Sequence, residues 1–434
     1  MRRVLIVSPH FPPTNAPEHL RVRMSLPYYR DYGWDPVVLA VDAADVPAPA
    51  DPLLAATIPD DLPVHRVHAS RSPWLRRLGI GSLGYRAWFP LRSAGDRLLR
   101  ESPFDLVYFS TTQFLLTMLG PRWLAEFGVP YVIDVQDPWR TDYYERPGAP
   151  PPPGGWKYRV ARWQAEHLEE RAWAEAAGFV SVSEAYVQQL AARYPWFSAR
   201  PWAVVPFGAP QQDFDLARQR QDLAPAFVRE PGCLHVVSVG AVGPIMRTSL
   251  ELLFAAASEL RTRHPEDVAR LRFDFIGTSY APADQAQPSV APLAEAAGVG
   301  DLVREAPGRI GYFTAIRTLL AADAIVIPGS DDAGYSPSKI ATCFLADKPT
   351  LALTPAGSAL DRMVTSLAFA TVARWPEPAA TTAAADFLIA LLVNPHPTRH
   401  PSRNWDKFSA EHTARARTRQ QCELFDRAVN ARPA

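Results

Sequence analysis

The chain has 434 residues, of which 47% are apolar, and its basic and acidic residues balance at 45 each. This length exceeds what one hydrophobic core normally supports and predicts two domains, while the zero net charge argues against general nucleic-acid binding. The three cysteines are scattered and odd in number, which indicates a reducing compartment. Since no apolar run reaches about 18 residues and the first run is too short for a signal sequence, we expect a cytoplasmic protein without a membrane span.

In the first half of the chain, short runs rich in Val, Ile and Leu alternate with longer helical patterns. Buried parallel strands have this appearance, because both of their faces are covered. The order predicts a doubly wound α/β domain with a parallel sheet. The expected strands are 4–9, 35–41, 62–68, 105–111, 130–137, 178–184 and 202–208, and the expected helices are 18–32, 114–127 and 157–177.

The same alternation starts again after a polar stretch at 208–225. We therefore expect two Rossmann-like domains, one over 1–210 and one over 211–403, and a tail that is helical from about Ala410. In the second domain the expected strands are 233–240, 271–277, 302–308, 323–329 and 350–356, and the expected helices are 249–264, 313–322 and 338–346.

A strand, a glycine-containing turn and the sequence Ser-Pro-Ser-Lys follow one another before the helix at 338–346. A helix N-terminus offers unpaired N–H groups and the positive end of a dipole. Ser336 or Ser338 can cap the helix, and Lys339, one of four lysines in the chain, adds a point charge suited to phosphate. The stretch therefore indicates a diphosphate site, and the alternative is an ordinary serine cap beside a solvated lysine.

Ligands of open α/β sheets bind beyond the carboxyl ends of the strands. With two such domains we expect one cleft between them. The loops expected around it are 8–13, 134–139, 239–244, 275–282 and 328–339.

Several segments together resemble the family-4 glycosyltransferases of the GT-B fold. They are "SPHFPPTNAPEHLRVRM", "YVIDVQDPW", "FIGTSYAP" and "GYSPSKIATCFLADKPTLAL". The similarity is greatest to the branch with a Y-[ST]-x-S-K segment found in bacterial surface-polysaccharide clusters. It implies two Rossmann-like domains that face a central cleft, with a closing helix within 404–434 that returns to the first domain.

The resemblance also implies an activity and a set of site residues. The activity is transfer of a hexose from a nucleotide-diphosphate sugar of UDP or GDP type to a glycan or lipid-linked acceptor, with retention of configuration and without a cofactor or metal. We expect the donor to contact Gly240, Gly243, Arg247, Gly277, Thr278, Tyr335, Ser336, Ser338 and Lys339. The expected sugar and acceptor contacts are His10, Asn15, Arg21, Asp137, Trp139, Asp331 and Asp332, and the catalytic roles fall to Asp137, Arg247 and Lys339.

In the family, two glutamates stand at the positions that Gly334 and Thr342 occupy in this chain. The chain departs from the family at these two positions. A non-catalytic relative that binds a nucleotide or glycan is therefore an open alternative. A nucleotide-sugar epimerase on the same fold is another, although its chemistry needs carboxylates and a histidine around the sugar, and no such set can be placed. For Arg21 the alternative is a surface charge on a helix, and for Asp137 it is a capping role.

The segment 71–100 holds seven arginines and one acidic residue, interleaved with large apolar side chains. Such a pattern suits peripheral contact with anionic lipid on the inner membrane face. A solvated helix with a buried aromatic face is the alternative. The apolar residues are Trp74, Leu75, Leu78, Ile80, Trp88, Phe89 and Leu91.

Overall fold

The computed structural model describes residues 1–46, 48–72, 81–141, 155–279, 285–331, 339–394 and 402–431. It divides the chain into two compact units. The first unit consists of Met1–Gly208 and Ala414–Ala434, and the second unit consists of Ala209–Thr413.

The first unit is built on a parallel sheet of seven strands in the order β3-β2-β1-β4-β5-β6-β7. Every pair of neighbouring strands is parallel, as the continuous apolar runs predicted. The strands are β1 (Arg2–Val7), β2 (Trp34–Val41), β3 (Val64–Val67), β4 (Leu106–Ser110), β5 (Tyr131–Val135), β6 (Gly178–Ser181) and β7 (Trp202–Val204).

The helix predicted over 18–32 is broken into three short pieces, because Pro27 has no backbone N–H to continue the helical ladder after Leu26. The helix predicted over 114–127 likewise begins as a 3-10 turn. The α-helices of the first unit are α1 (Leu20–Ser25), α3 (Leu83–Glu101), α4 (Leu119–Phe127), α5 (Trp156–Trp173), α6 (Glu184–Arg193) and α16 (Ala414–Asn430). Its 3-10 helices are η1 (Pro17–His19), η2 (Tyr29–Tyr32), η3 (Ala43–Asp45), η4 (Pro52–Thr57), η5 (Phe114–Met118) and η7 (Pro195–Ala199).

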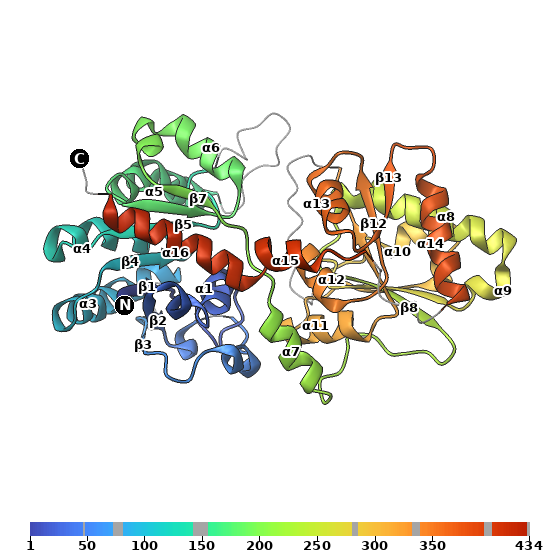
Figure 1. Cartoon of the computed structure of the whole chain (residues 1–434), viewed down its shortest axis with the longest axis horizontal. Helices are drawn as coiled ribbons and strands as arrows, with labels where there is room; N and C mark the ends of the chain where they lie inside the picture. The colour runs from blue at the N-terminus through green and yellow to red at the C-terminus, as the bar shows by residue number, and fades with distance from the viewer. Residues whose placement is uncertain are drawn as a thin grey trace. The chain divides into compact units, whose positions relative to one another are not determined.

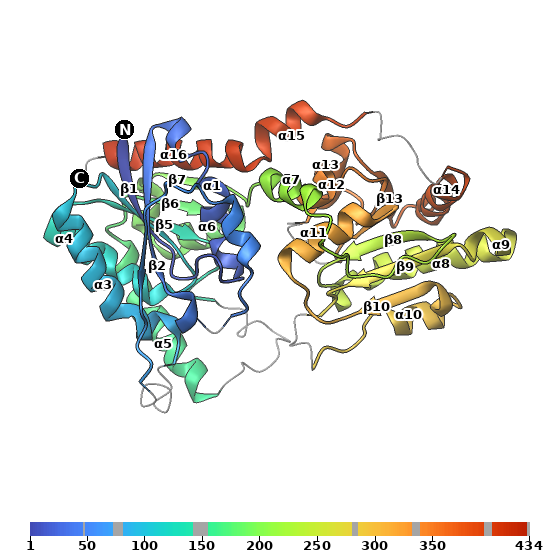
Figure 2. The same cartoon turned by 90° about the horizontal axis from the view of Figure 1, so that it is seen from below.

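Successive side chains of each strand enter two different cores, one on each face of the sheet. In β1, Val4 and Ile6 pack with α1 and α16, whereas Leu5 and Val7 pack with α3, α4 and α5. Figures 1 and 2 show α1 and α16 along one face of this sheet and α3, α4 and α5 along the other. Because both faces are covered, the stretch Val4–Val7 of β1 is entirely apolar and buried.

The closing helix α16 is fastened to the first unit by an aromatic cluster. The ring of Phe425 lies 4.9 Å from that of Tyr108, 5.5 Å from that of Trp34 and 6.2 Å from that of Tyr29. Beside it, the side-chain amide of Gln421 accepts a hydrogen bond from the Tyr29 hydroxyl at 3.1 Å. The return of the final helix to the first domain is therefore confirmed.

The second unit repeats the architecture with six parallel strands in the order β10-β9-β8-β11-β12-β13. The two doubly wound parallel sheets predicted for the chain are thus confirmed. The strands are β8 (Leu234–Val239), β9 (Leu271–Ile276), β10 (Val303–Ala306), β11 (Ala324–Pro328), β12 (Thr350–Pro355) and β13 (Thr371–Trp375).

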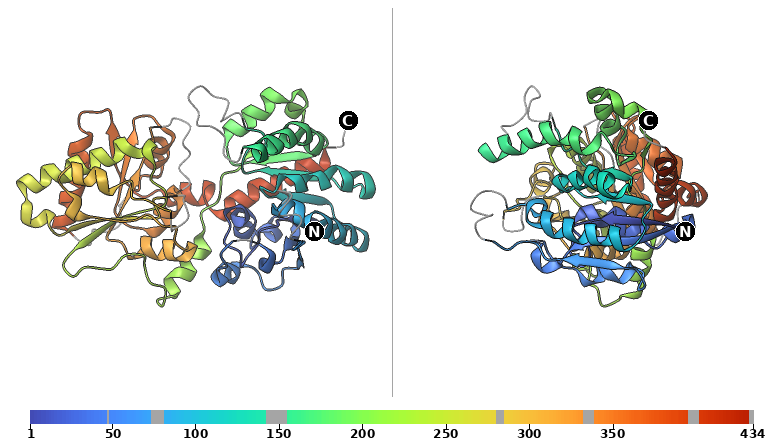
Figure 3. Two further views of the ribbon diagram at one scale, coloured as in Figure 1. Left: turned by 180° about the vertical axis from the view of Figure 1, so that it is seen from behind. Right: turned by 90° about the vertical axis from the view of Figure 1, so that its left-hand side faces the viewer.

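Helices α8 and α14 cover one face of the second sheet, where Phe254 and Leu388 pack against Val236 and Phe273. Figure 3, left, shows this face with α8, drawn yellow-green, in front of the sheet. None of the described helices is both long and apolar enough to cross a membrane. The helices are α7 (Gln211–Gln219), α8 (Arg247–Arg263), α9 (Pro265–Val268), α10 (Ala291–Ala296), α11 (Tyr312–Ala321), α12 (Ile340–Ala346), α13 (Ala359–Leu367), α14 (Ala380–Val393) and α15 (Trp405–Glu411), with the 3-10 turns η8 (Pro244–Met246) and η9 (Gly300–Leu302).

Two features of the second half were not predicted. Strand β13 and helices α13 and α14 arise from a stretch that the sequence analysis left unassigned, and the helical tail is divided into α15 and α16. The sequence of α14 is apolar and has little helical periodicity, so its pattern does not distinguish a buried helix from a buried strand.

We expect Phe425→Ala to lower the free energy of unfolding by about 3–5 kcal/mol, because it removes a fully buried ring and leaves a cavity between α16 and the first sheet. Urea unfolding followed by tryptophan fluorescence measures the change. Arg419→Ala on the same helix, where the side chain is half exposed, should change stability by less than about 0.5 kcal/mol. Equal effects of the two substitutions would contradict the role of the aromatic cluster.

Candidate functional site

Strand order reverses at one point in each sheet, between β1 and β4 in the first unit and between β8 and β11 in the second. In open α/β sheets, the loops that leave the carboxyl ends of such strands diverge and make room for a ligand. The loops singled out in the sequence follow β1, β5, β8, β9 and β11, so all lie at the carboxyl edge of their own sheet. The cleft predicted between the domains stays a prediction.

In the second unit, the side chain of Lys339 reaches from the segment after β11 to the loop after β8, the two strands between which the strand order reverses. Lys339 stands directly before α12, on the chain segment that follows β11, and its Nζ donates a hydrogen bond to the carbonyl oxygen of Ala241 at 3.0 Å. Ala241 belongs to the loop after β8. The ammonium group therefore lies at the edge of the sheet.

The lysine side chain passes so close to the β8 loop that a side chain at Gly240 would displace its end. A Cβ at position 240 would lie 2.7 Å from Nζ of Lys339, and the φ angle of +102° is one that residues with a side chain rarely adopt. Gly240 was predicted as a donor contact, and the structure gives a local reason for a glycine at this position. The glycine makes room for the ammonium group.

Burial lowers the pKa of Lys339 from 10.5 to about 8, although the nearby Cys343 acts in the opposite sense. Burial also raises the pKa of the Cys343 thiol to about 12, so this neighbour carries no charge at neutral pH. Lys339 is still mostly protonated at pH 7. An anion placed against it would restore the solvation that the ammonium has lost, and would gain from the low local dielectric.

The loops after β8 and β11 are joined to each other as well. The backbone N–H of Asp331 donates to the carbonyl oxygen of Ile245 at 2.7 Å, and the Ser249 hydroxyl donates to that of Gly329 at 2.7 Å. Asp331 itself is exposed. These bonds join the segment after β11, through Gly329 and Asp331, to η8 and the first turn of α8.

Of three further predicted donor contacts, two have other partners and one lies in an open part of its loop. Arg247 is exposed over 65% of its side chain and forms an ion pair with Glu251 at 2.6 Å on the outside of α8. Thr278, which follows Gly277 at the end of β9, donates its hydroxyl to Glu305 at 2.5 Å and is buried. Gly243 lies in the open part of the β8 loop, with nothing within 4 Å of its Cβ position.

The remaining predicted residues of this segment, Asp332, Tyr335, Ser336 and Ser338, lie outside the described residues, and Gly334 does too. Thr342 is described. Its hydroxyl donates to the carbonyl oxygen of Lys339 at 2.7 Å, within α12 and its first turn. Thr342 therefore supplies no carboxylate at this position.

In the first unit, a buried carboxylate joins the loops after β1 and β4. Glu18 lies 2.5 Å from Nδ1 of His10 and accepts hydrogen bonds from the Thr112 backbone N–H at 3.1 Å and from the Thr111 hydroxyl at 3.3 Å. His10 was predicted as a substrate contact. The structure places it at the sheet edge, with its ring held by Glu18.

The charge of Glu18 also affects Asp137, which is exposed after the end of β5. Burial by itself would raise the pKa of Glu18, but the hydrogen bond and charge of His10 and the hydrogen bonds of Thr112 outweigh burial and lower it. Asp137 has no such compensation. The protein around it restricts its hydration and Glu18 repels its charge, so its pKa is raised.

Arg21, another predicted substrate contact, lies in the interior of the first unit with 2% of its surface exposed. Its Nε donates to Asp134 at 2.9 Å, and its guanidinium lies over the ring of Phe207. Ser110 and Gln136 donate to the same carboxylate at 2.7 and 2.8 Å. This network neutralises a charge inside the protein, as buried charges require.

The last two predicted contacts are half-buried. The backbone N–H of Asn15 donates to Pro49 at 2.7 Å, which fixes the loop after β1 against a neighbouring loop. Trp139 stacks on Phe114 with ring centroids 5.6 Å apart. Trp139 thus presents one aromatic face to Phe114 near the end of β5.

Two carboxylates that organise these edges were not among the predicted site residues. The sequence analysis assigned Glu18 to a predicted helix. The signal that could have identified it is the Thr111–Thr112 pair after a strand, because these residues are its hydrogen-bond partners. Glu305 lies within β10, next to its carboxyl end. It accepts hydrogen bonds from the backbone N–H groups of Ser289, Val290 and Ala291, and so holds the start of α10.

Residues 19–208 match the family model described as a glycosyl transferase 4-like domain. The match covers most of the first unit and less than half of the chain. No curated protein matches the chain.

The whole chain is similar in structure to several solved proteins. It covers 100% of sucrose-phosphate synthase from Thermosynechococcus elongatus and is itself covered in full, with a TM-score of 0.56 and 14% identity. Against Anabaena HepE in complex with UDP, the TM-score is 0.53 and the identity 15%, with 98% of this chain and 100% of that chain covered. Against a trehalose-phosphate synthase from Burkholderia xenovorans, in complex with glucose-6-phosphate, the values are 0.55 and 11%, with 98% and 100% covered. The GT-B fold is thereby confirmed.

The buried ammonium predicts a pH-dependent stability. Because the pKa of Lys339 is about 8 in the folded chain and near 10.5 when unfolded, the unfolded chain holds more protons between these values. The free energy of unfolding should therefore receive a contribution from this group that rises from about pH 8 to 10.5. Lys339→Met should remove that contribution, which urea unfolding of both proteins at about pH 7.5 and about pH 10 would measure. The same pH dependence in both proteins would contradict a desolvated ammonium.

Proposed function

We propose that the chain is a glycosyltransferase that moves a hexose from a nucleotide-diphosphate sugar to a glycan or lipid-linked acceptor. The observation that carries this proposal is the position of Lys339, whose ammonium group is desolvated at the reversal point of the second sheet. The glycosyl transferase 4-like domain of the first unit supports it. The complexes of two structurally similar proteins with UDP and with glucose-6-phosphate point to the same classes of donor and acceptor.

The chemistry of such a transfer explains the lysine. As the glycosidic bond to the diphosphate breaks, negative charge accumulates on the departing diphosphate. A fixed cation in a water-poor site stabilises that charge more in the transition state than in the ground state. Lys339 lies in a suitable environment, because the loops on both sides of it are held by backbone hydrogen bonds.

In the proposed reaction, the first unit binds the acceptor at its own sheet edge. His10 is oriented by Glu18, and Asp137 lies exposed at the end of β5 with a raised pKa. An exposed carboxyl of this kind can accept a hydrogen bond from a sugar hydroxyl. We propose that the reaction retains the anomeric configuration and uses no metal, as the family resemblance implies.

We propose a cytoplasmic location, with peripheral contact to the inner membrane face through 71–100. Within the described part of this segment, Phe89 is 71% exposed on α3, Trp88 is half-buried and Leu91 is buried. Trp74, Leu75, Leu78 and Ile80 lie outside the described residues. Among the described residues of this segment, the proposed lipid contact uses Phe89 and Arg92, which is 39% exposed, whereas Arg86 is buried.

Release of free nucleotide diphosphate from a panel of UDP- and GDP-sugars, with and without glycan acceptors, tests the proposed reaction. We expect release to depend on one donor and to increase when an acceptor is present. Nucleotide binding without turnover, for every donor and acceptor, would instead favour a non-catalytic relative. That outcome would agree with the absence of the family's two glutamates at Gly334 and Thr342.

Lys339→Ala should weaken binding of the nucleotide diphosphate by about 1–3 kcal/mol, as expected for the loss of a charged hydrogen bond. Isothermal titration calorimetry with UDP and GDP measures this. At about pH 8.5 the wild-type protein should also take up protons on binding, because the diphosphate raises the pKa of a lysine that is partly neutral in the free protein. Titrations in two buffers with different ionisation enthalpies detect the uptake.

Lys407→Ala is the matched control, since it removes a lysine from α15 that belongs to no predicted contact. It should leave both the affinity and the proton uptake unchanged. Wild-type affinity in Lys339→Ala would refute the assignment of this lysine to the diphosphate.

A further inference from the structure

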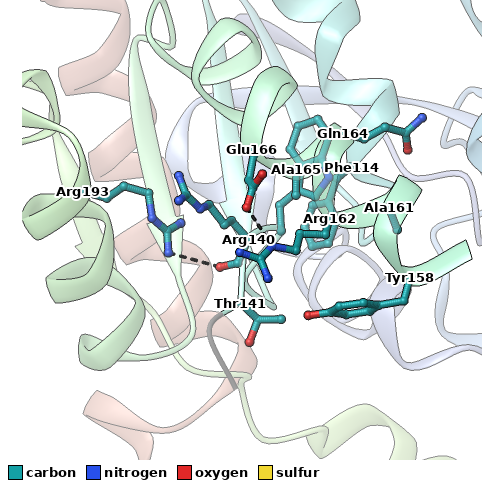
Figure 4. A pocket seen from close by; sticks show the side chains of 11 residues that line it. Phe114, Arg140, Thr141, Tyr158, Ala161, Arg162, Gln164, Ala165, Glu166 and Arg193 are labelled. Carbon is teal, nitrogen blue, oxygen red and sulfur yellow. Dashed lines mark hydrogen bonds and ion pairs between the residues drawn. The ribbon is translucent and has the colours of Figure 1, made fainter. Parts of the chain in front are cut away.

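The first unit contains a cavity of about 350 Å³ beside the end of β5, separate from the Glu18 network described above. Figure 4 shows its lining side chains, which come from the segment after β5, from α5, and from the ends of η5 and α6. The lining residues are Phe114, Trp139, Arg140, Thr141, Tyr158, Ala161, Arg162, Gln164, Ala165, Glu166 and Arg193.

The cavity has an excess of positive charge. Arg162 forms an ion pair with Glu166 at 2.8 Å, and Arg193 forms one with Glu169 at 2.8 Å. Among the described residues, the guanidinium of Arg140 has no hydrogen-bond or ion-pair partner. Three guanidinium groups therefore face two carboxylates. The surplus is one positive charge, on a side chain that lines the cavity.

A buried carboxylate holds this arrangement in place. Glu169 is 1% exposed and accepts hydrogen bonds from the Arg140 backbone N–H at 2.9 Å and from the Tyr194 hydroxyl at 2.8 Å, in addition to its bond with Arg193. Arg193 also donates to the carbonyl oxygen of Arg140 at 3.3 Å. In Figure 4 the side chains of Arg140, Arg162 and Arg193 lie near one another. The backbone of Arg140 is thus fixed while its guanidinium stays available.

The other side of the cavity is aromatic. Trp139 stacks on Phe114 and lies 6.0 Å from the ring of Trp173 behind it. Tyr158 also lines the cavity, and its hydroxyl points toward Thr141 in Figure 4. A pocket with aromatic walls and a few fixed polar groups is typical of a small-ligand site. Its shape suits a sugar ring that carries an anionic group.

The helix that lines this cavity also presents an apolar stripe to solvent. Trp156, Val160 and Trp163 are 59%, 46% and 56% exposed, and their spacing places them on one face of α5. Arg159, also exposed, lies between them in the sequence. Exposed tryptophans beside basic residues are typical of a helix at a lipid–water interface. The anionic ligand can therefore be free in solution or attached to a lipid.

We propose that this cavity binds the phosphate group of the acceptor, with Arg140 as its principal ligand and the aromatic wall against the attached sugar. The phosphate belongs either to a soluble sugar phosphate or to a lipid-linked sugar. This inference rests on the proposed glycosyl transfer, because it assigns the cavity to the acceptor.

Arg140→Gln tests the site, because the change removes the surplus charge without breaking an ion pair. Arg159→Gln is the matched control, an exposed arginine on α5 that does not line the cavity. In the first arm, calorimetry compares glucose 6-phosphate with glucose. In the second arm, flotation compares phosphatidylcholine vesicles with and without a polyprenyl phosphate.

We expect the wild-type chain to bind the phosphate-bearing probe in at least one arm and to discriminate against its phosphate-free counterpart. Arg140→Gln should weaken that binding about tenfold or more, and Arg159→Gln should change it less than about twofold. Binding in the first arm identifies a soluble acceptor, and binding in the second arm alone identifies a lipid-linked one. No binding in either arm, or equal binding by Arg140→Gln, would overturn the proposal.

Calorimetry with UDP and donor turnover on the same preparations separates this inference from the proposed function. A preparation that turns over a nucleotide sugar but binds no phosphate probe through Arg140 would refute the site alone. A preparation that binds the probe through Arg140 but turns over no donor would refute the transferase, and would leave a phosphate site in the first unit.

Discussion

The second unit brings a lysine ammonium group into a partly buried position, 3.0 Å from the Ala241 carbonyl oxygen, at the point where its strand order reverses. Desolvation of a charge is unfavourable by itself, and the depressed pKa of Lys339 reflects this. The position is maintained because Gly240 leaves room for the side chain and because backbone hydrogen bonds join the loops on either side. An anionic ligand would relieve the desolvation, and the functional proposal depends on that gain.

The first unit uses charge differently at the corresponding edge. There, Arg21 and Asp134 neutralise each other in the interior, and Glu18 is surrounded by donors from two loops. These groups shape the edge rather than present charge to solvent. The groups that do reach the solvent are Asp137 at the end of β5 and the arginines of the cavity beside it. Acceptor recognition in the first unit is therefore expected from residues after β5.

A division of labour between the two units follows from these observations. The second unit offers one cation suited to a diphosphate, and the first unit offers a carboxyl group, an aromatic wall and a surplus guanidinium suited to a charged sugar. The exposed tryptophans of α5 lie on the helix that lines the cavity. Each of these groups lies on a segment that follows a parallel strand or on a helix packed beside one, which is where this fold supports variable chemistry.

The sequence by itself determined the two parallel sheets, because strands covered on both faces must be apolar throughout, and it placed Lys339 at the carboxyl edge, because that position follows from the order strand, turn, helix. The tertiary structure alone decided which charges are buried. Arg21 and Arg140 both come from segments that follow strands of the first sheet, yet one meets Asp134 in the interior and the other faces a cavity. The direction of a side chain depends on partners far away in the chain, such as Phe207 and Glu169, and local patterns carry no record of them.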